Sequence, residues 1–159
     1  MIKIEKMEMK HFELIKDKLD EYDEFWNANI LKSELESSLS KYIVAIDDKN
    51  DLVGFAGIII LPDDTEITNI VVKKSNRKQG IGKLLLEELI NMSIKENKPI
   101  ISLEVNEKNI PAISLYEGFD FIKVGRRKKY YNGEDDAIIM SKKIMWFFEN
   151  LIALFFCLI

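Results

Sequence analysis

The sequence predicts a single α/β domain, and three consecutive segments of its 159 residues carry this prediction. Glu66–Val72 alternates and then ends on three β-branched residues, which is typical of a strand. From Gly80 onward, apolar side chains recur at the spacing of one helical face, at Ile81, Leu84, Leu85 and Leu89. Ile100–Val105 is a second apolar strand. Because it follows a crossover helix, we expect it to lie parallel to the first strand.

The chain before this unit begins with a strand and two helices. Ile2–Met7 alternates as a short strand, and His11–Asp20 follows with the spacing of an amphipathic helix. A second helix starts after Asn27, a residue suited to the N-cap, and its apolar face extends to Leu39. Between the helices lies the acidic run Asp17–Glu24, which is most often a solvated surface and is also suited to attract a basic partner.

Four further strands and one short helix complete the predicted domain. Tyr42–Ile46 and Leu52–Leu61 form a hairpin through a turn-rich connection. Asn109–Tyr116 predicts a short helix with a proline near its first turn. The closing strands, Phe121–Val124 and Ala137–Met140, enclose a basic and aromatic segment.

Two glycines separated by one residue open the central helix, shortly after the turn residues Ser75 and Asn76. A helix N-terminus leaves N–H groups without intrahelical partners, and its dipole favours an anion. Glycine has no side chain to obstruct a phosphate. Five basic residues surround the turn: Lys73, Lys74, Arg77, Lys78 and Lys83. The pattern favours a phosphate-bearing ligand, although an ordinary turn with a solvated basic loop has the same short signature.

Two common phosphate-binding motifs are excluded at this turn. A Walker motif needs serine or threonine after Gly-Lys, whereas Leu84 follows Gly82-Lys83, and only one residue separates the glycines. A dinucleotide-binding motif needs a third glycine where Leu85 stands.

A carboxylate stands near the end of the second apolar strand, at Glu104. A parallel strand is normally covered on both faces, where an unpaired glutamate is costly. The crevice at the carboxyl ends of such strands is a common ligand site, so Glu104 is a candidate functional residue. Solvent exposure at a fraying strand end is the alternative. Tyr116, twelve residues later, is either functional or a tyrosine at the edge of the core.

Composition limits the possible functions. The net charge of -4 argues against direct nucleic-acid binding. Residues 1–72 carry 16 acidic and 8 basic side chains, and residues 73–159 carry 11 and 15, so the second half suits a polyanionic cofactor. The single Cys157 excludes an internal disulfide and fits a reducing, cytoplasmic location. The single His11 argues against a metal site or a histidine-based triad, because both need clusters.

The segment Arg77–Gly82 resembles the Q/R-x-x-G-x-G/A motif of the GCN5-related N-acetyltransferases (GNAT), in which it wraps the pyrophosphate of acetyl-CoA. Other segments match in the same order and spacing: Glu66–Val72, Leu103–Val105, Asn109–Tyr116, Tyr130–Tyr131 and Glu134–Met140. Together, over about residues 2 to 143, they resemble the RimI group, which acetylates the N-terminal alanine of a small-subunit ribosomal protein. The resemblance implies a GNAT domain over residues 1–144, with a mixed sheet flanked by helices.

The resemblance also implies how the cofactor binds. Acetyl-CoA would be wedged between the two parallel strands. Ile70, Val71 and Val72 would bind its acetyl and pantetheine portion through the main chain, and Asn109 its pantetheine arm. The residues that match the pyrophosphate loop are Lys78, Gln79, Gly80, Ile81, Gly82 and Lys83.

The same resemblance implies direct acyl transfer without a nucleophilic side chain or a metal. Glu104 matches the general base of the family and Tyr116 its general acid. Tyr130 and Tyr131 would line the slot for the acceptor, the basic N-terminal tail of a ribosomal protein. Two alternatives remain open. The acceptor is another amine, such as a protein lysine, a polyamine or a small molecule, or the domain only binds acyl-CoA.

Two features depart from the family pattern. Asp120 stands where a glycine usually ends the helix that carries Tyr116, which puts the placement of that tyrosine in question. Beyond the resemblance, residues 145–159 form a hydrophobic tail, interrupted by Glu149 and Asn150. A membrane-spanning helix needs about 20 apolar residues, so we expect packing or self-association, with interfacial membrane binding as the alternative.

Overall fold

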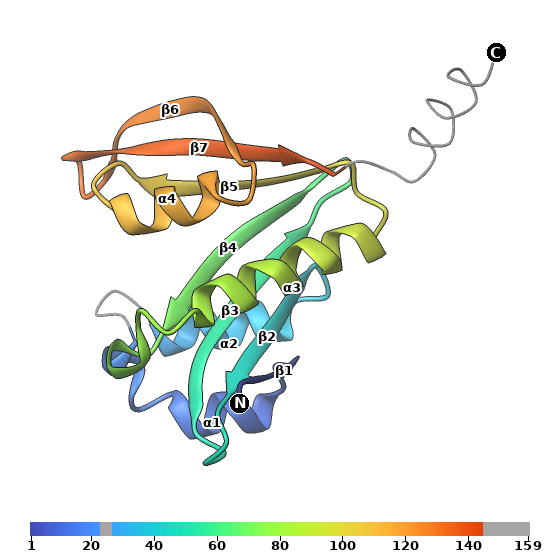
Figure 1. Ribbon diagram of the computed structural model, residues 1–159, viewed down its shortest axis with the longest axis vertical. Coiled ribbons are helices and arrows are strands. Elements are labelled where there is room, and N and C mark those ends of the chain that lie inside the picture. Colours follow the sequence, from blue (N-terminus) through green and yellow to red (C-terminus); the bar gives the residue numbers. More distant parts are fainter. Residues whose placement is uncertain (23–26, 145–159) are drawn as a thin grey trace.

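The computed structural model describes residues 1–22 and 27–144, which form one mixed sheet with helices on both faces (Figure 1). Its strands lie in the order β1-β2-β3-β4-β5-β7-β6. They are β1 (Lys3–Lys6), β2 (Ser40–Ile46), β3 (Leu52–Ile60), β4 (Thr65–Val72), β5 (Ile100–Asn106), β6 (Ile122–Tyr131) and β7 (Asp135–Lys143). The helices are α1 (Met9–Ile15), α2 (Ala28–Glu36), α3 (Ile81–Lys95) and α4 (Ile110–Glu117). The α/β class and the mixed sheet are as predicted. The predicted tail, residues 145–159, lies outside the described part.

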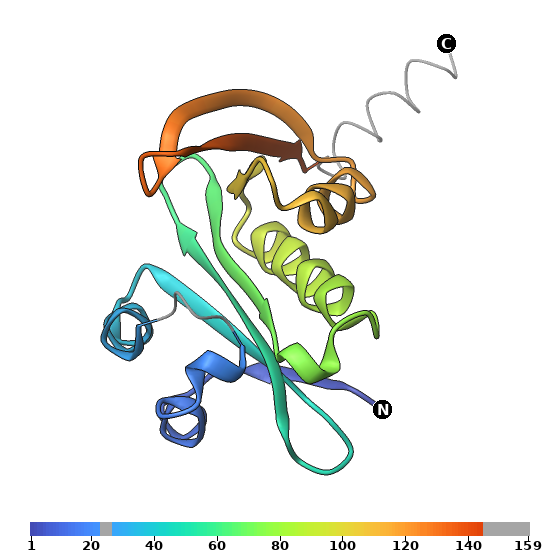
Figure 2. The same ribbon diagram turned by 90° about the vertical axis from the view of Figure 1, so that its left-hand side faces the viewer.

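The sheet separates two hydrophobic cores. Figure 2 shows α1 and α2 on one face and α3 and α4 on the other. On the α3 face, Leu85, Leu86 and Leu89 are fully buried, and burying a leucine contributes about 2 kcal/mol. On the opposite face, Leu31 packs with Phe55. The buried stripe of α3 therefore positions the glycine turn at its N-terminus against the sheet.

β4 and β5 are parallel for only three residue pairs, from Thr65↔Ile101 to Ile67↔Leu103. β4 also contains a bulge, because Gly57 pairs with Asn69 and Ile58 with Ile67, which leaves Thr68 as the additional residue. A bulge bends its strand and increases the local twist. The two strands consequently part beyond Ile67 and Leu103, and Figure 1 shows the wedge that opens between their carboxyl ends.

Several predicted boundaries were wrong, and the closing strand predicted over Ala137–Met140 is the longer β7. The helix predicted over His11–Asp20 is the shorter α1, followed by a 3₁₀ turn at Leu19–Glu21. α2 ends at Glu36 rather than at Leu39, because Ser37 is extended and its hydroxyl accepts from the N–H of Leu39 at 3.3 Å. β6 includes the whole basic and aromatic segment. As an edge strand exposed along nearly all of its length, it has no core face and shows no alternation.

The helix that carries Tyr116 ends in a Schellman turn despite the missing glycine. Phe121 N–H donates to the Tyr116 carbonyl at 3.1 Å, and Asp120 N–H to that of Glu117 at 3.1 Å. Asp120 takes the left-handed conformation that the motif requires, with φ 64°. The rings of Tyr116 and Phe121 supply the hydrophobic contact of the motif, with centroids 5.9 Å apart. The helix-ending turn is therefore retained, and Tyr116 is held against Phe121.

We expect Asp120→Gly to raise the free energy of unfolding by about 1 kcal/mol, because glycine adopts positive φ without a Cβ penalty. The change also removes a negative charge from a helix C-terminus. The lost ion pair with Lys142, 3.4 Å long and exposed, contributes little. Urea unfolding measures the difference. The reciprocal control is Gly133→Ala, at φ 75°, which should cost about 1 kcal/mol although its Cβ would meet no atom within 4 Å. A less stable D120G would contradict this reading.

Candidate active site

The glycine turn forms an open helix N-terminus. Gly80 is the N-cap of α3 at φ 81°, and the first helical hydrogen bond runs from Leu84 N–H to the Gly80 carbonyl at 3.1 Å. The N–H groups of residues 81–83 therefore precede the helical ladder. A Cβ at Gly82 would make only ordinary contacts, at 3.7 Å to Leu115 and 3.9 Å to Val72. This space and the dipole of a 15-residue helix fit a pyrophosphate group.

Five polar or basic residues of the turn divide into two groups. Lys78, Gln79 and Lys83 are exposed around the N-terminus of α3, as expected for side chains that meet a cofactor. Arg77 instead donates to the carbonyls of Tyr22, at 2.7 Å, and Val72, at 3.2 Å. Lys73 pairs with Glu21 at 2.7 Å. These two cations tie the turn to the 3₁₀ turn at Leu19–Glu21 and hold its position.

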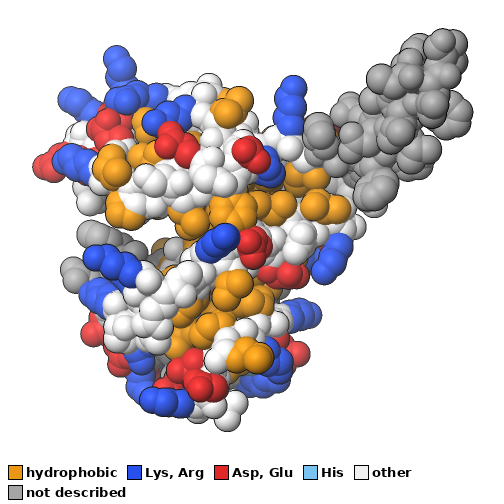
Figure 3. All heavy atoms as spheres, in the orientation of Figure 1, with side chains coloured by type: hydrophobic (Ala, Val, Ile, Leu, Met, Phe, Trp, Pro, Cys, Tyr) orange, Lys and Arg blue, Asp and Glu red, His pale blue; other side chains and the backbone are white. Residues whose placement is uncertain are grey.

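Ile70–Val72 lie beyond the point where β4 leaves β5. Within the described part of the chain, the edge of β4 that faces β5 therefore has no strand partner at these residues. Ile70 and Val72 pack toward α3, and Val71 is buried toward α1 and α2. Figure 3 shows the surface hollowed on this side, between α4 and the N-terminal end of α3. Unpaired main-chain groups next to a hollow suit the predicted main-chain contacts to acetyl-CoA.

Asn109 lies at the start of α4 and Tyr116 in its last turn, and Tyr130 and Tyr131 end β6. Asn109 is the N-cap of α4, where its Oδ1 accepts from Ala112 N–H at 3.3 Å; its contact with a pantetheine arm stays a prediction. Tyr116 is 8% exposed, and burial, with a smaller contribution from Tyr131, raises its pKa to about 12. Burial, followed by the charge of Glu104, raises the pKa of Tyr131.

Glu104 is the first residue of β5 after the last pair with β4. It pairs with Ile139 of β7, so it does not lie at a frayed end. Its side chain is 18% exposed, and its Oε1 lies 2.7 Å from Nε of Arg127. Burial raises the pKa of the Glu66 carboxyl group on β4, and the charge of Glu104 raises it further. The charge of Arg127 lowers the same pKa. Glu104, Glu66 and Arg127 therefore share one electrostatic environment where the strands part.

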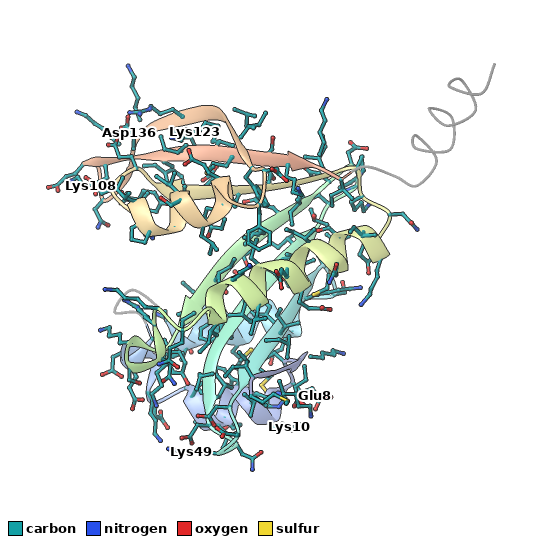
Figure 4. The ribbon with its side chains drawn as sticks, viewed as in Figure 1. Glu8, Lys10, Lys49, Lys108, Lys123 and Asp136 are labelled. Atoms are coloured by element: carbon teal, nitrogen blue, oxygen red, sulfur yellow. The ribbon has the colours of Figure 1, made fainter. Side chains whose placement is uncertain are left out.

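The hairpin that carries Arg127, Tyr130 and Tyr131 is held by Asp136. The Asp136 carboxylate accepts from Lys129 N–H at 2.8 Å and from Arg126 at 2.8 Å, and these bonds hold its pKa below the usual range. Figure 4 labels Asp136 on this hairpin, above α4. The register shifts between Arg127 and Tyr131, so β6 is irregular there, and Tyr131 pairs with Asp135 next to the turn. Tyr130 and Tyr131 meet edge to face, with centroids 5.2 Å apart, and Tyr130 is 52% exposed.

Sequence reasoning missed Glu66, Arg127 and a polar cluster on β4. Glu66 pairs with Ser102, and only this register brings its side chain to the face of Glu104. In the cluster, the Tyr42 hydroxyl accepts from Asn69 Nδ2 at 2.6 Å and contacts Glu34. Asn69 Oδ1 is buried without a hydrogen-bond partner among the described residues. The signal available for Asn69 was a polar residue inside an apolar strand.

A model of the acetyltransferase (GNAT) family matches residues 3–121. The chain belongs to this family. A Bacillus subtilis protein provisionally assigned as a ribosomal protein bS18-alanine N-acetyltransferase is 40% identical to this GNAT chain over 108 residues, 67% of this chain and 70% of the relative. The Escherichia coli K12 ribosomal protein bS18-alanine N-acetyltransferase is 36% identical over 96 residues, 58% of this chain and 65% of the relative.

Solved structures agree with the family. The crystal structure of the E. coli ribosomal-protein-S18-alanine N-acetyltransferase superposes with a TM-score of 0.83 at 27% identity, covering 92% of this chain and 96% of that one. A chain of the NatC complex, bound to Gag peptide and CoA, gives a TM-score of 0.78 at 26% identity, covering 91% and 99%. This GNAT protein is an acetyl-CoA-dependent N-acetyltransferase. Within the described residues, no helix has the length and apolar character to cross a membrane.

Proposed function

We propose that this enzyme transfers the acetyl group of acetyl-CoA to the N-terminal α-amine of a ribosomal protein, with alanine as the acceptor residue. Relatives named for this reaction at 36–40% identity support the acceptor class. The observation that carries the proposal is the placement of Glu104, with its side chain 18% exposed, where β4 and β5 part. The acidic run Asp17–Glu24, of which residues 23 and 24 lie outside the described part, suits a basic tail.

Glu104 acts as the general base in this proposal, and the acceptor nitrogen attacks the thioester directly. The ammonium of the acceptor loses two protons during the reaction. One goes to solvent through Glu104, with a water between them because of the large pKa gap between a carboxylate and an ammonium. The loss of the second proton is offset in the overall reaction by the proton that the departing thiolate receives. N–H groups on the unpaired edge of β4 polarise the thioester carbonyl as negative charge develops on its oxygen.

Tyr116 acts as the general acid and supplies the proton to the thiolate. With a pKa of about 12, its phenol stays protonated throughout the neutral range and presents a hydrogen-bond donor to the departing sulfur. Its position depends on the Schellman turn at Asp120, which fixes the last turn of α4. No metal enters these steps.

An α-amine suits a carboxylate base better than a lysine side chain does. The reference pKa values are about 7.8 and 10.4, a gap of about 2.6 units, so deprotonating lysine costs roughly 3.5 kcal/mol more. The alternatives are acetylation of another amine and a domain that only binds acyl-CoA. The second alternative would leave Glu104 and Tyr116 without a role in turnover.

We expect alanine-led peptides from ribosomal proteins to be acetylated at least ten-fold faster at pH 7.5 than peptides offering only lysine amines, because more of the α-amine is unprotonated. Mass spectrometry of a peptide panel after incubation with acetyl-CoA measures the rates and locates the acetyl group. An N-terminally blocked copy of each peptide is the matched control. Faster acetylation of polyamines or lysine side chains would overturn the proposed acceptor, and binding of acetyl-CoA without any turnover would favour the acyl-CoA-binding module.

A further inference from the structure

Arg127 contacts two parts of the acceptor side of the site. Its Nε lies 2.7 Å from Oε1 of Glu104, and its guanidinium carbon lies 5.7 Å from the centre of the Tyr130 ring. The Arg127 side chain is 58% exposed, whereas that of Glu104 is 18% exposed. One cation therefore connects the proposed base with the predicted wall of the acceptor slot and stays accessible from outside.

The groups around this cation are mainly acidic. Glu66 lies on β4, and Asp64 lies in the turn before it. Burial raises the pKa of Glu66 most, and the charges of Glu104 and Asp64 raise it further. Tyr130 and Tyr131 come from β6, and Glu104 raises the pKa of Tyr131, again after burial. Arg127 acts on Glu66 in the opposite direction and pairs with Glu104. Without Arg127, an incoming amine would meet these two carboxylates without the cation that acts on both.

We infer that Arg127 sets the charge of the acceptor site, so that the site does not hold the acceptor's amine in its unreactive ammonium form. This inference rests on the proposed acetyl transfer. An ammonium among uncompensated carboxylates keeps its proton more strongly, and a protonated amine has no lone pair with which to attack a thioester. Arg127 acts through Glu104 and through the acceptor, so it is a positioning residue and not a catalytic one.

Removing the cation has two linked effects on kinetics. An exposed ion pair of this kind changes binding by about three-fold. In Arg127→Gln, the KM for the acceptor peptide should therefore fall about three-fold, because the ammonium binds better. Since the bound amine then gives up its proton less readily, kcat at pH 7 should fall by about the same factor, leaving kcat/KM nearly unchanged. The pH at which kcat reaches half of its maximum should increase by about half a pH unit.

Two variants control for charge and for fold. Arg127→Lys keeps the cation and should restore most of the wild-type kcat and KM. Lys128→Gln removes the same charge from the next residue of β6, also exposed, and should leave both constants unchanged. A fall in kcat with unchanged KM, or the same effect in K128Q, would overturn the inference, because a structural disturbance would explain either result.

Calorimetry separates this inference from the proposed function. With coenzyme A present, R127Q should bind the free-amine peptide about three-fold more tightly than the wild type does, and the N-acetylated peptide equally well. An inactive wild type that shows this difference would end the proposed function and leave the charge effect of Arg127 standing. An active wild type with identical peptide affinities in R127Q would end the inference alone.

Discussion

Glu104→Gln should lower kcat/KM for the acceptor peptide by about 10² to 10⁴-fold while the Kd for acetyl-CoA stays unchanged. Glutamine has the same shape as glutamate but accepts no proton, so it removes the base without opening a cavity. The variant should also fold normally, because the partner that it leaves behind, Arg127, is 58% exposed and is solvated without the ion pair. Initial rates at saturating acetyl-CoA, together with calorimetry for coenzyme binding, measure the two effects separately.

The matched control for this experiment is Glu87→Gln, which removes an exposed carboxylate from α3. It should retain wild-type turnover. Tyr116→Phe should also reduce kcat with coenzyme affinity intact, because it removes only the hydroxyl of a ring whose packing against Phe121 remains. Full turnover in E104Q would show that Glu104 is not the general base. Glu66, the other carboxylate on which Arg127 acts, would then be the next candidate.

Gly82→Asp should weaken acetyl-CoA binding by at least 100-fold and yet leave the fold as stable as before or slightly more so. A Cβ at this position meets only ordinary contacts, so the protein accommodates the side chain. A carboxylate in the first turn of a helix interacts favourably with the helix dipole, by about 0.5 kcal/mol. The same carboxylate occupies the space at the α3 N-terminus and repels a pyrophosphate there. Calorimetry with acetyl-CoA and thermal unfolding test the two halves of this prediction.

Asn91→Asp adds one negative charge to the same helix, at an exposed position two turns further along. It should reduce acetyl-CoA affinity by less than about two-fold, because screening weakens a charge at that distance. Equal losses in both variants would show that net charge, rather than the helix N-terminus, governs coenzyme binding. Unchanged affinity in G82D would place the pyrophosphate elsewhere.

Much of the fold follows from local patterns. The stripe of α3 was predictable because Leu85 and Leu89 recur at helical spacing, although Leu84, counted on that face, is 38% exposed and Leu86 is buried instead. The cap Asn27 was predicted, because its side chain bonds the helix N-terminus directly, whereas Asn109, predicted as part of its helix, is the N-cap of α4. β6 was mispredicted because an edge strand without a buried face leaves no alternation in its sequence.

The residues of the candidate site also fall into two groups, those that the sequence predicted and those that it did not. The glycine turn, Glu104 and Tyr116 carry short-range signals or match a family motif, so they were predicted from the sequence. Arg127 and Glu66 carry none, since each enters the site through strand register: Glu66 opposite Ser102, and Arg127 opposite Ala137. A one-residue slip in either strand would turn these side chains to the other face.

By itself, the sequence determined an α/β chain and predicted an anion-binding helix N-terminus, since backbone N–H groups and glycines act within a few residues of one another. Only the tertiary structure decided that β4 and β5 part after three pairs, and that Arg127 and Glu66 gather around Glu104. Those contacts depend on a bulge at Thr68 and on the register of a distant hairpin. Their physical cause is the packing of segments as many as sixty residues apart, which no local pattern encodes.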